Sequence, residues 1–275
     1  MTTNKDNFGN RMKEFEGLEA ARMACPLLPI MIRLDGKGFS KWTKGLKRPF
    51  DADLSNVMIG TALHLAEELN ASCAYTQSDE ISLVLYSDNY SKETIFNGKF
   101  QKLVSVSASI ATAHFNNTAR KIWPDKPLAL FDSRAWTVPT KGEAANAFLW
   151  RQQDATKNSI SMAARHYYSH KELQGKKGSE MQEMLFQKGV NWNDYPDFFK
   201  SGTFIIRKKV KTKLSTEQIE KLPKNHDARS DPNYKFERNV YAIESIPRFS
   251  GMVNRDMIIF YGEDPIHEDD PWHCY

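Results

Sequence analysis

The 275-residue sequence predicts an α+β fold in which a ferredoxin-like core is followed by an appended region of mixed helices and strands. Two observations support this prediction. Residues up to 139 alternate apolar, β-prone runs with segments of helical periodicity, in the order β-α-β-β-α-β. Past Pro139 the pattern changes to long helical segments followed by another strand. We therefore expect one unit over residues 1–139 and a second over residues 140–275.

The elements of the first unit follow from local patterns. The run LLPIMIRLDG (27–36) is apolar and ends at Asp-Gly, which indicates a buried strand and its exit turn. Residues 51–71 place apolar side chains at helical spacing, and either Asp51 or Asp53 can cap that helix. The remaining expected elements are strands AYTQ (74–77) and ISLVLY (81–86), a helix from about Lys92 to Thr118, and a strand within LALFDSRAWTVP (128–139).

The second unit is expected to begin with a long helix over residues 142–168. A second helix follows in SEMQEMLFQKG, where Ser179 and Gln182 fit a capping box and Gly189 is a stop signal. TFIIRKKVK (203–211) predicts a strand, and STEQIEKLP (215–223) predicts a short capped helix.

Composition limits the class of protein. With 40% apolar and 26% charged residues, the chain is expected to be globular rather than disordered. No apolar run approaches the roughly 18 residues of a membrane span, and the polar N-terminus lacks the apolar core of a secretory signal. The three cysteines, Cys25, Cys73 and Cys274, fit neither a disulfide framework nor a zinc spacing. We therefore expect a cytoplasmic protein with no membrane partner.

The positive charge is concentrated in two stretches that contain no acidic residue, 37–49 and 199–214. Such stretches suggest a polyanion, either nucleic acid or nucleotide phosphate. We favour phosphate for the first stretch. For the second, lysines that protect an exposed strand edge are an equal alternative. Residues His267, Glu268, Asp269, His273 and Cys274 are interpreted as a frayed tail rather than a metal site.

Ser78-Asp79-Glu80 separates two expected strands, and a hairpin turn alone explains it, because Ser and Asp favour turns. In a ferredoxin-like sheet, however, the first two strands are expected near each other in the middle, so that Asp35 and Asp79 meet at one edge. Two carboxylates beside the Gly36 carbonyl form a hard-oxygen site suited to Mg²⁺. Two such ions, about 3.5–4 Å apart, can bridge a hydroxyl and a triphosphate. Phosphate contacts are then expected from the backbone at Gly36 and Gly38 and from Lys37, Lys47 and Arg48.

The segments IRLDGKGFSKWTKGLKRPFD and YTQSDEISLVL together resemble the tRNA-His guanylyltransferase family, which adds nucleotides in the 3′-to-5′ direction. The resemblance continues in FDSRAWTVP, WRQQDATKN and EMLFQKGVNWNDYPDFFKSGTFIIRK, and covers most of residues 8–262. It implies a polymerase-palm catalytic domain over 1–139, with 140–275 completing it and binding RNA. It also implies nucleoside triphosphates and tRNA as partners, and a homotetramer.

By this resemblance Asp35, Gly36 and Asp79 hold two Mg²⁺ ions, and Glu80 assists Asp35 and Asp79 in catalysis; a solvated turn carboxylate is the alternative for Glu80. The family's nucleotide-binding positions are Asp35, Gly36, Lys37, Gly38, Phe39, Ser40, Arg48, Ser78 and Asp79. Arg48 stands where the family usually has lysine. Contacts to RNA or phosphate are implied for Lys102, Arg134, Arg151, Lys157 and Asn158, although Lys102 and Arg134 could equally be surface charges.

One departure points to the branch of the family that repairs 5′-truncated tRNAs on a template. Members that select tRNA-His carry a histidine followed by I-N-N-L-Y-N after W-R-Q-x-D, whereas this chain reads Thr156-Lys157-Asn158-Ser159. A family lysine is also replaced by Met181. The alternatives are a guanylyltransferase specific for tRNA-His, a palm-fold nucleotide cyclase, and a non-catalytic RNA-binding protein. No G-G-D/E-E-F segment supports a diguanylate cyclase.

Overall fold

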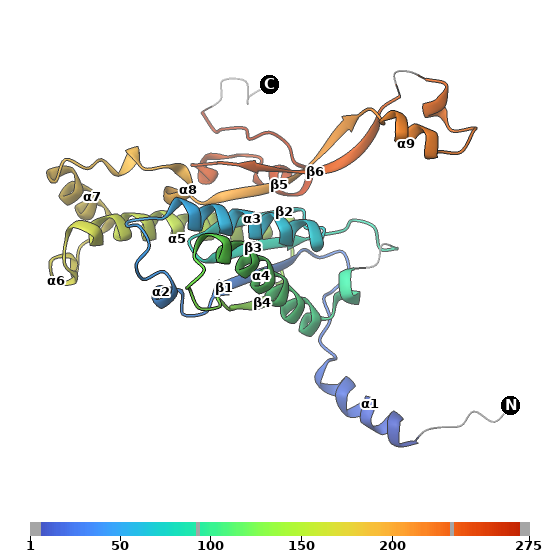
Figure 1. Ribbon diagram of the computed structural model, residues 1–275, viewed down its shortest axis with the longest axis horizontal. Helices are drawn as coiled ribbons and strands as arrows, with labels where there is room; N and C mark the ends of the chain where they lie inside the picture. The colour runs from blue at the N-terminus through green and yellow to red at the C-terminus, as the bar shows by residue number, and fades with distance from the viewer. Residues whose placement is uncertain (1–6, 92–93, 232–233, 270–275) are drawn as a thin grey trace.

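The computed structural model describes residues 7–91, 94–231 and 234–269 (Figure 1). Its centre is an antiparallel six-stranded sheet in the order β4-β1-β3-β2-β5-β6. The strands are β1 Ile30–Gly36, β2 Cys73–Gln77, β3 Glu80–Leu85, β4 Phe131–Thr137, β5 Thr203–Thr212 and β6 Phe236–Glu244. The α-helices are α1 Asn7–Glu19, α2 Phe39–Trp42, α3 Ala52–Glu68, α4 Phe100–Ile122, α5 Lys141–Tyr167, α6 His170–Leu173, α7 Gly178–Gln187, α8 Asp197–Lys200, α9 Thr216–Lys221 and α10 Arg255–Tyr261.

The first unit has the predicted ferredoxin-like order, with β1, α3, β2, β3, α4 and β4 in sequence. The first two strands lie near each other in the middle of the sheet, as expected, with β3 between β1 and β2. In this arrangement β3 pairs antiparallel with both β1 and β2. The hairpin turn therefore lies beside the end of β1, and the predicted meeting of the two aspartates follows from β3 rather than from β2.

Alternate residues of the strands supply two separate apolar cores. Ile30, Ile32 and Leu34 of β1 pack with residues of α3 and α4 on one face. On the other face Met31 of β1 belongs to a cluster with Phe148 of α5 and with side chains of α10. The face toward α5 is apolar at the start of β1 and becomes polar at its end, where Arg33 and Asp35 follow Met31 with the same orientation.

The sheet continues past residue 139 without interruption. β5 lies between β2 and β6 over residues 203–206, and beyond Ile206 it pairs with β6 alone. The two strands extend away from the rest of the sheet toward α9, as Figure 1 shows. Within the second basic stretch, Lys208 forms ion pairs with Glu244 at 2.6 Å and Asp264 at 3.2 Å. At least this lysine is therefore neutralised within the chain.

Two predicted helix starts are wrong. The helix expected from about Lys92 is α4, which begins at Phe100, because residues 95–98 form a 3₁₀ turn in which Phe96 and Asn97 have positive φ. Residues 92 and 93 lie outside the described residues. The expected Ser179–Gln182 capping box is also absent, since the cap of α7 is Lys177, whose backbone N–H donates to Glu180.

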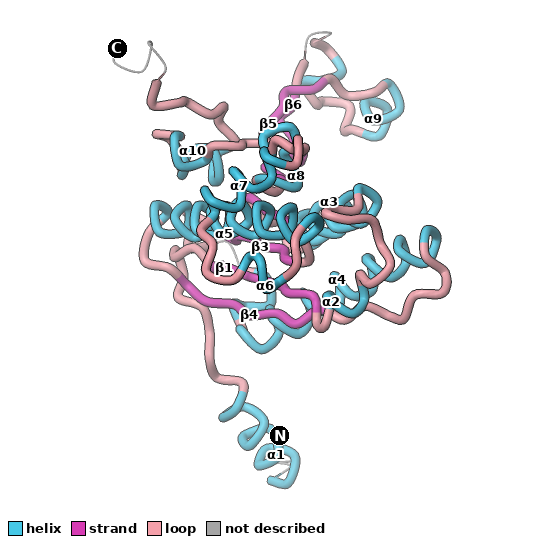
Figure 2. Tube along the Cα trace, turned by 90° about the vertical axis from the view of Figure 1, so that its left-hand side faces the viewer, coloured by secondary structure: helices cyan, strands magenta, loops and turns pink. Residues whose placement is uncertain are grey.

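Other local predictions are confirmed. Asp51 caps α3 by accepting from the Leu54 N–H at 3.1 Å. Gly189, with φ 76°, follows the end of α7, and Ser215 forms a capping box with Gln218 at the start of α9. Helix α1 was not expected from the sequence, and it stands apart from the body of the molecule in Figure 2.

Candidate active site

The turn between β2 and β3 brings two carboxylates together. Ser78 and Asp79 form the predicted hairpin turn, with Ser78 in the left-handed region at φ 50°. The Gly36 N–H donates to the Asp79 carbonyl at 3.1 Å, and Asp35 lies opposite Glu80 in the β1–β3 register. Asp35 and Asp79 consequently lie at the same edge of the sheet and line one cavity.

The electrostatics of this edge favour a bound cation. Burial, followed by the negative charge of Asp35, raises the pKa of Asp79 from 3.8 to about 6, although the Ser78 hydroxyl donates to its Oδ1 at 3.1 Å. Two mutually repelling carboxylates fit a divalent ion, whose charge removes the repulsion. Within the described residues no group of three or more His, Cys, Asp and Glu gathers around one point. A Mg²⁺ ion here would thus depend on these aspartates, backbone oxygen, water and substrate phosphate, as is usual for Mg²⁺.

A cavity of about 590 Å³ opens beside the aspartates, between the polar end of the sheet and α5. Helical spacing on α5 directs one face of that helix into the cavity. The lining combines the acidic edge with three arginines: Arg33, Asp35, Gln77, Ser78, Asp79, Glu80, Trp150, Arg151, Asn158, Ser161, Met162 and Arg165. The cavity thus offers carboxylates for a metal at one end and cations for phosphate.

Glu80 is held by a buried ion pair. Arg151 Nε donates to Glu80 Oε1 at 2.6 Å and Arg151 Nη2 donates to Glu80 Oε2 at 2.7 Å. Arg151 Nη2 also donates to Asp154, at 3.0 Å. The alternative that Glu80 is a solvated turn carboxylate is therefore wrong, because both residues of the pair are buried. This pair fixes the turn that carries Asp79 against α5.

Six of the lining residues were not predicted from the sequence, and three of them, Arg33, Trp150 and Arg165, bear on phosphate or base contacts. Two guanidinium groups contact the Trp150 ring, that of Arg151 at 4.5 Å and that of Arg33 at 5.4 Å from its centre. Arg165 lies at the far end of the same helical face. Two signals were available: Arg33 precedes Asp35 by two strand positions, and Arg165 continues the spacing of Arg151, Asp154 and Asn158 along α5.

The predicted nucleotide-binding segment forms the exit from β1 and the start of α2. Gly38 has φ 68°, a conformation that glycine adopts without strain. At Gly36 a Cβ would collide with the Phe39 ring. The Phe39 side chain is itself buried beside Trp42 and Phe131, so only its backbone can meet a nucleotide. The side chains of Lys37, Ser40, Lys47 and Arg48 are exposed, and Ser78 is exposed at the turn.

The predicted RNA-binding residues are divided by the structure. Arg151 and Asn158 line the cavity, whereas Lys157 is exposed outside its lining. Arg134 is exposed on β4, opposite Arg33 in the register, and pairs with Asp132 at 3.0 Å. Lys102 is exposed on α4, the helix that packs against the opposite face of the sheet. The structure therefore does not bring Lys102 to the carboxylates.

The structure describes only part of the C-terminal tail for which no metal site was predicted. His267 and Asp269 pair at 3.3 Å, and they belong to no metal-binding group among the described residues. His273 and Cys274 lie outside the part of the chain that the structure describes.

Comparisons with known proteins agree with this arrangement. A family model described as tRNAHis guanylyltransferase matches residues 9–139. The tRNA(His) guanylyltransferase of Saccharomyces cerevisiae is 30% identical over 210 residues, which are 69% of this chain and 87% of that protein. The tRNA(His) guanylyltransferase of Schizosaccharomyces pombe is 31% identical, and the match covers 72% of this chain and 80% of that protein.

Two similar proteins have solved structures with a bound nucleotide. A bacterial tRNA(His) guanylyltransferase-like protein in complex with ATP is 45% identical, with a TM-score of 0.70, and the match covers 72% of this chain and 88% of that one. A second such protein, in complex with GTP, is 34% identical with a TM-score of 0.68 over 89% of this chain and 95% of that one. The present chain belongs to the tRNA(His) guanylyltransferase family and is a nucleotidyltransferase.

Proposed function

We propose that this protein adds nucleotides in the 3′-to-5′ direction to the 5′ end of tRNA, with Mg²⁺, and that the opposite strand of the acceptor stem selects the nucleotide. The observation that carries the proposal is the meeting of Asp35 and Asp79 beside a cavity lined by arginines. Carboxylates suit a metal, and arginines suit the phosphates of a triphosphate and of an RNA end.

Asp35, Asp79 and the Gly36 carbonyl are the groups that would hold two Mg²⁺ ions. Such ions supply charge stabilisation to the phosphates and favour the ionised form of the attacking hydroxyl. The raised pKa of Asp79 supports this assignment, because burial and then the charge of Asp35 raise it, and a bound cation would offset both effects. Glu80 is assigned a positioning role, since both of its oxygens accept hydrogen bonds from Arg151.

Residues in the cavity and at the exit from β1 bind and orient the substrates. Lys37, Ser40 and Arg48 can contact the triphosphate where the chain leaves β1. The 3′-hydroxyl of the bound nucleotide attacks the activated 5′ phosphate of the RNA. A new P–O bond forms while the bond to the leaving nucleotide or pyrophosphate breaks. Before this step, a 5′-monophosphate is activated with ATP or GTP, whereas a 5′-triphosphate needs no activation. Arg33 and Arg165 are placed to hold the RNA phosphates.

Template selection is supported by the position that replaces the histidine of the tRNA-His-selective members. The Thr156 hydroxyl donates to the Gln152 carbonyl, at 3.1 Å, within α5. It is therefore engaged with its own helix and is poorly suited to contact a base. The neighbouring Lys157 is exposed and can contact phosphate, which positions RNA without distinguishing its sequence. Base pairing is then the remaining source of selection.

The proposal is tested by incubating the protein with labelled nucleoside triphosphates, Mg²⁺ and a tRNA that lacks its first 5′ nucleotide. We expect an RNA longer by one nucleotide, and no extension by the Asp79→Asn variant. A cyclic nucleotide as the product would support the cyclase alternative. RNA binding without any product, at saturating nucleotide and Mg²⁺, would instead support a non-catalytic role.

Location and assembly stay predictions. Among the described residues no helix is long and apolar enough to cross a membrane. A cytoplasmic location and a homotetramer remain part of the proposal.

A further inference from the structure

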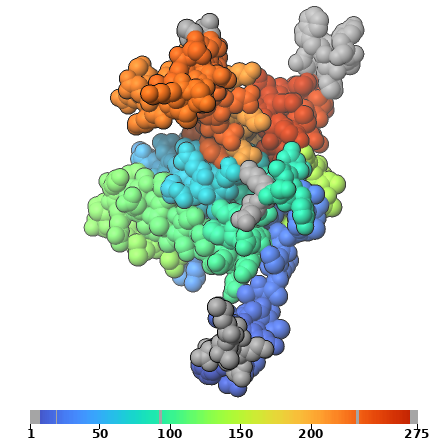
Figure 3. Space-filling view, turned by 90° about the vertical axis from the view of Figure 1, so that its right-hand side faces the viewer, coloured from blue at the N-terminus to red at the C-terminus, as the bar shows by residue number. Residues whose placement is uncertain are grey.

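Helix α1 carries an apolar stripe that the rest of the described chain leaves exposed. Phe8, Met12, Phe15 and Leu18 recur at the spacing of one helical face, and they are 66%, 39%, 57% and 71% exposed. Figures 1 and 3 show the helix protruding from the body of the molecule. An isolated surface residue of this kind needs no explanation, whereas a continuous stripe indicates a contact surface.

This helix is not expected to persist in isolation. It has 13 residues, which is near the lower limit for a helix in water, and two of them are the poor helix formers Gly9 and Gly17. Its charged residues are Arg11, Lys13, Glu14, Glu16 and Glu19, which do not form the basic face of a helix that binds anionic lipid. A protein surface is the better partner.

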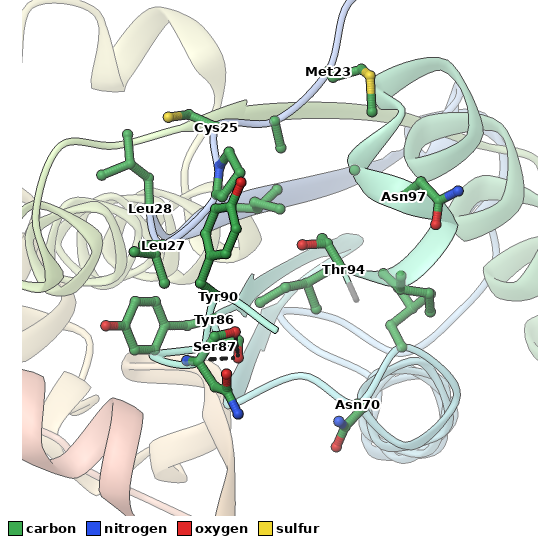
Figure 4. Close-up of a pocket in the computed structure, with 18 residues that line it drawn as sticks. Met23, Cys25, Leu27, Leu28, Asn70, Tyr86, Ser87, Tyr90, Thr94 and Asn97 are labelled. Atoms are coloured by element: carbon green, nitrogen blue, oxygen red, sulfur yellow. Dashed lines mark hydrogen bonds between the residues drawn. The ribbon is translucent and has the colours of Figure 1, made fainter. Parts of the chain in front are cut away.

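The base of α1 adjoins a pocket of about 610 Å³. We call it the arm pocket; it is lined by Met23, Ala24, Cys25, Pro26, Leu27, Leu28, Ile30, Leu69, Asn70, Leu85, Tyr86, Ser87, Asn89, Tyr90, Thr94, Ile95, Asn97 and Gly98. Figure 4 shows Tyr90 in the opening, with Leu27 and Leu28 on one side and Asn97 on the other. Because none of the described lining residues is charged, the pocket is better suited to apolar side chains with a polar rim than to nucleotide phosphates.

The pocket lies at the opposite end of β1 from the aspartates. Ile30 begins the strand at the pocket and Asp35 lies near its other end, so the two sites are separated by roughly 17 Å along the strand. A protein segment in the arm pocket therefore leaves the candidate active site open.

The connection to the body is too short for α1 to turn back easily. Met23 forms a bridge with Lys99, and the Arg22 carbonyl accepts from the Phe100 N–H at 3.2 Å. Only Ala20 and Ala21 remain between these fixed residues and the helix end at Glu19. A short hinge of this kind favours exchange of the segment between two copies over its return to the same chain.

We propose that α1 of one copy docks into the arm pocket of a second copy, and that the exchange is reciprocal around a two-fold axis. Because each pocket adjoins the base of its own α1, bringing two bases together places each helix near the other copy's pocket. Two phenylalanines, a methionine and a leucine from each copy, with the surfaces that receive them, bury on the order of 1,500 Å² in total, which is the standard size of a stable interface.

Cross-linking tests the exchange directly, because Cys25 is exposed and lines the pocket while Cys73 is buried. One chain carries Met12→Cys, Cys25→Ser and Cys274→Ser; the other carries only Cys274→Ser and a different affinity tag. The two chains are co-expressed, treated with a short bis-maleimide and analysed by peptide mass spectrometry. We expect a link between position 12 of the first chain and Cys25 of the second, in a covalent dimer. Its absence would overturn the proposal.

Two further measurements distinguish exchange of α1 between copies from two alternatives. In one, α1 folds back onto its own chain; in the other, the copies make a contact that does not involve the apolar stripe. A single chain with both Met12→Cys and Cys25 would form only an internal link if α1 folded back, and that result without mixed dimers would also contradict exchange. For the matched pair, Phe15→Glu acts on the apolar stripe and Lys13→Glu on the opposite face. Phe15→Glu should reduce the mixed cross-link at least tenfold, and Lys13→Glu should leave it within twofold. Equal yields from both variants would mean that the stripe does not form the contact.

Discussion

Arg151 and Glu80 form a two-pronged ion pair between residues 71 positions apart, with N–O distances of 2.6 and 2.7 Å. Glu80 directly follows Asp79, so the pair connects α5 to the turn that carries a predicted metal ligand. The same arginine lies 4.5 Å from the centre of the Trp150 ring. Changes on α5 are therefore expected to reach the catalytic edge through this contact.

Arg151→Met should leave Glu80 buried without its partner, which is expected to lower the free energy of unfolding by about 3–5 kcal/mol. Adding Glu80→Leu removes the unpaired charge and should recover most of that loss. Urea unfolding measures both effects. If the position of the turn matters, the double variant should still add nucleotides at least tenfold more slowly than the wild type. Wild-type turnover by the double variant would show that the pair is only structural.

Asp35→Asn and Asp79→Asn should each abolish nucleotide addition and preserve the fold, because each removes one of the two carboxylates of the proposed metal site. Each should also lose the increase in Tm that Mg²⁺ gives the wild type, a readout that does not depend on turnover. Asp53→Asn, an exposed position in the first turn of α3, is the matched control. A Mg²⁺-dependent Tm increase of wild-type size in both site variants would contradict the assignment.

Asp79 should also make the metal-free protein less stable as the pH rises. Its pKa is about 6 in the folded state and near 3.8 when unfolded, so the folded state binds more protons between these values. Stability from this group is present below pH 3.8 and lost as the pH rises through 6, by up to about 3 kcal/mol. The difference in unfolding free energy between Asp79→Asn and the wild type should thus increase from pH 4 to pH 7. A constant difference would be inconsistent with the raised pKa.

Arg48→Ala should weaken nucleotide use without changing metal binding. A cation on a triphosphate contributes hydrogen bonds worth roughly 1.5–3 kcal/mol, which corresponds to a tenfold to hundredfold loss in kcat/KM. Arg48→Lys should retain much of the activity, because the family usually has lysine at this position, and Lys44→Ala is the exposed control in the same segment. An unchanged kcat/KM for Arg48→Ala at subsaturating GTP would make Arg48 an ordinary surface charge.

The sequence was most informative where the signal was local or periodic. The apolar run before Asp35, the helix capped by Asp51 and the turn at Ser78 were each expected, and their order was enough to indicate the ferredoxin-like core. The start of α4 was missed because the positive φ values of Phe96 and Asn97 interrupt an otherwise helical pattern. Neither residue type signals such a conformation as glycine does.

Contacts between residues far apart in the sequence were harder to predict. Glu80 looks like a solvated turn residue in its local sequence, and only its pairing with α5 buries it. Trp150 and Arg33 come from different elements, and their contact depends on how α5 crosses the sheet. Helix α1 was not predicted, because polar residues and two glycines interrupt its apolar stripe, and the stripe packs against nothing in the described part of the chain.

The most direct test of templated 3′-to-5′ addition uses tRNAs that lack the first 5′ nucleotide and differ only in the base opposite the gap. Each of the four nucleotides is offered separately to each of the four templates, for tRNA-His and for one other tRNA. We predict that the Watson–Crick partner is added in every case, and that the two tRNAs differ by less than about a hundredfold in kcat/KM, or roughly 2.7 kcal/mol. Guanosine addition opposite every base, or a larger preference for tRNA-His, would contradict the account.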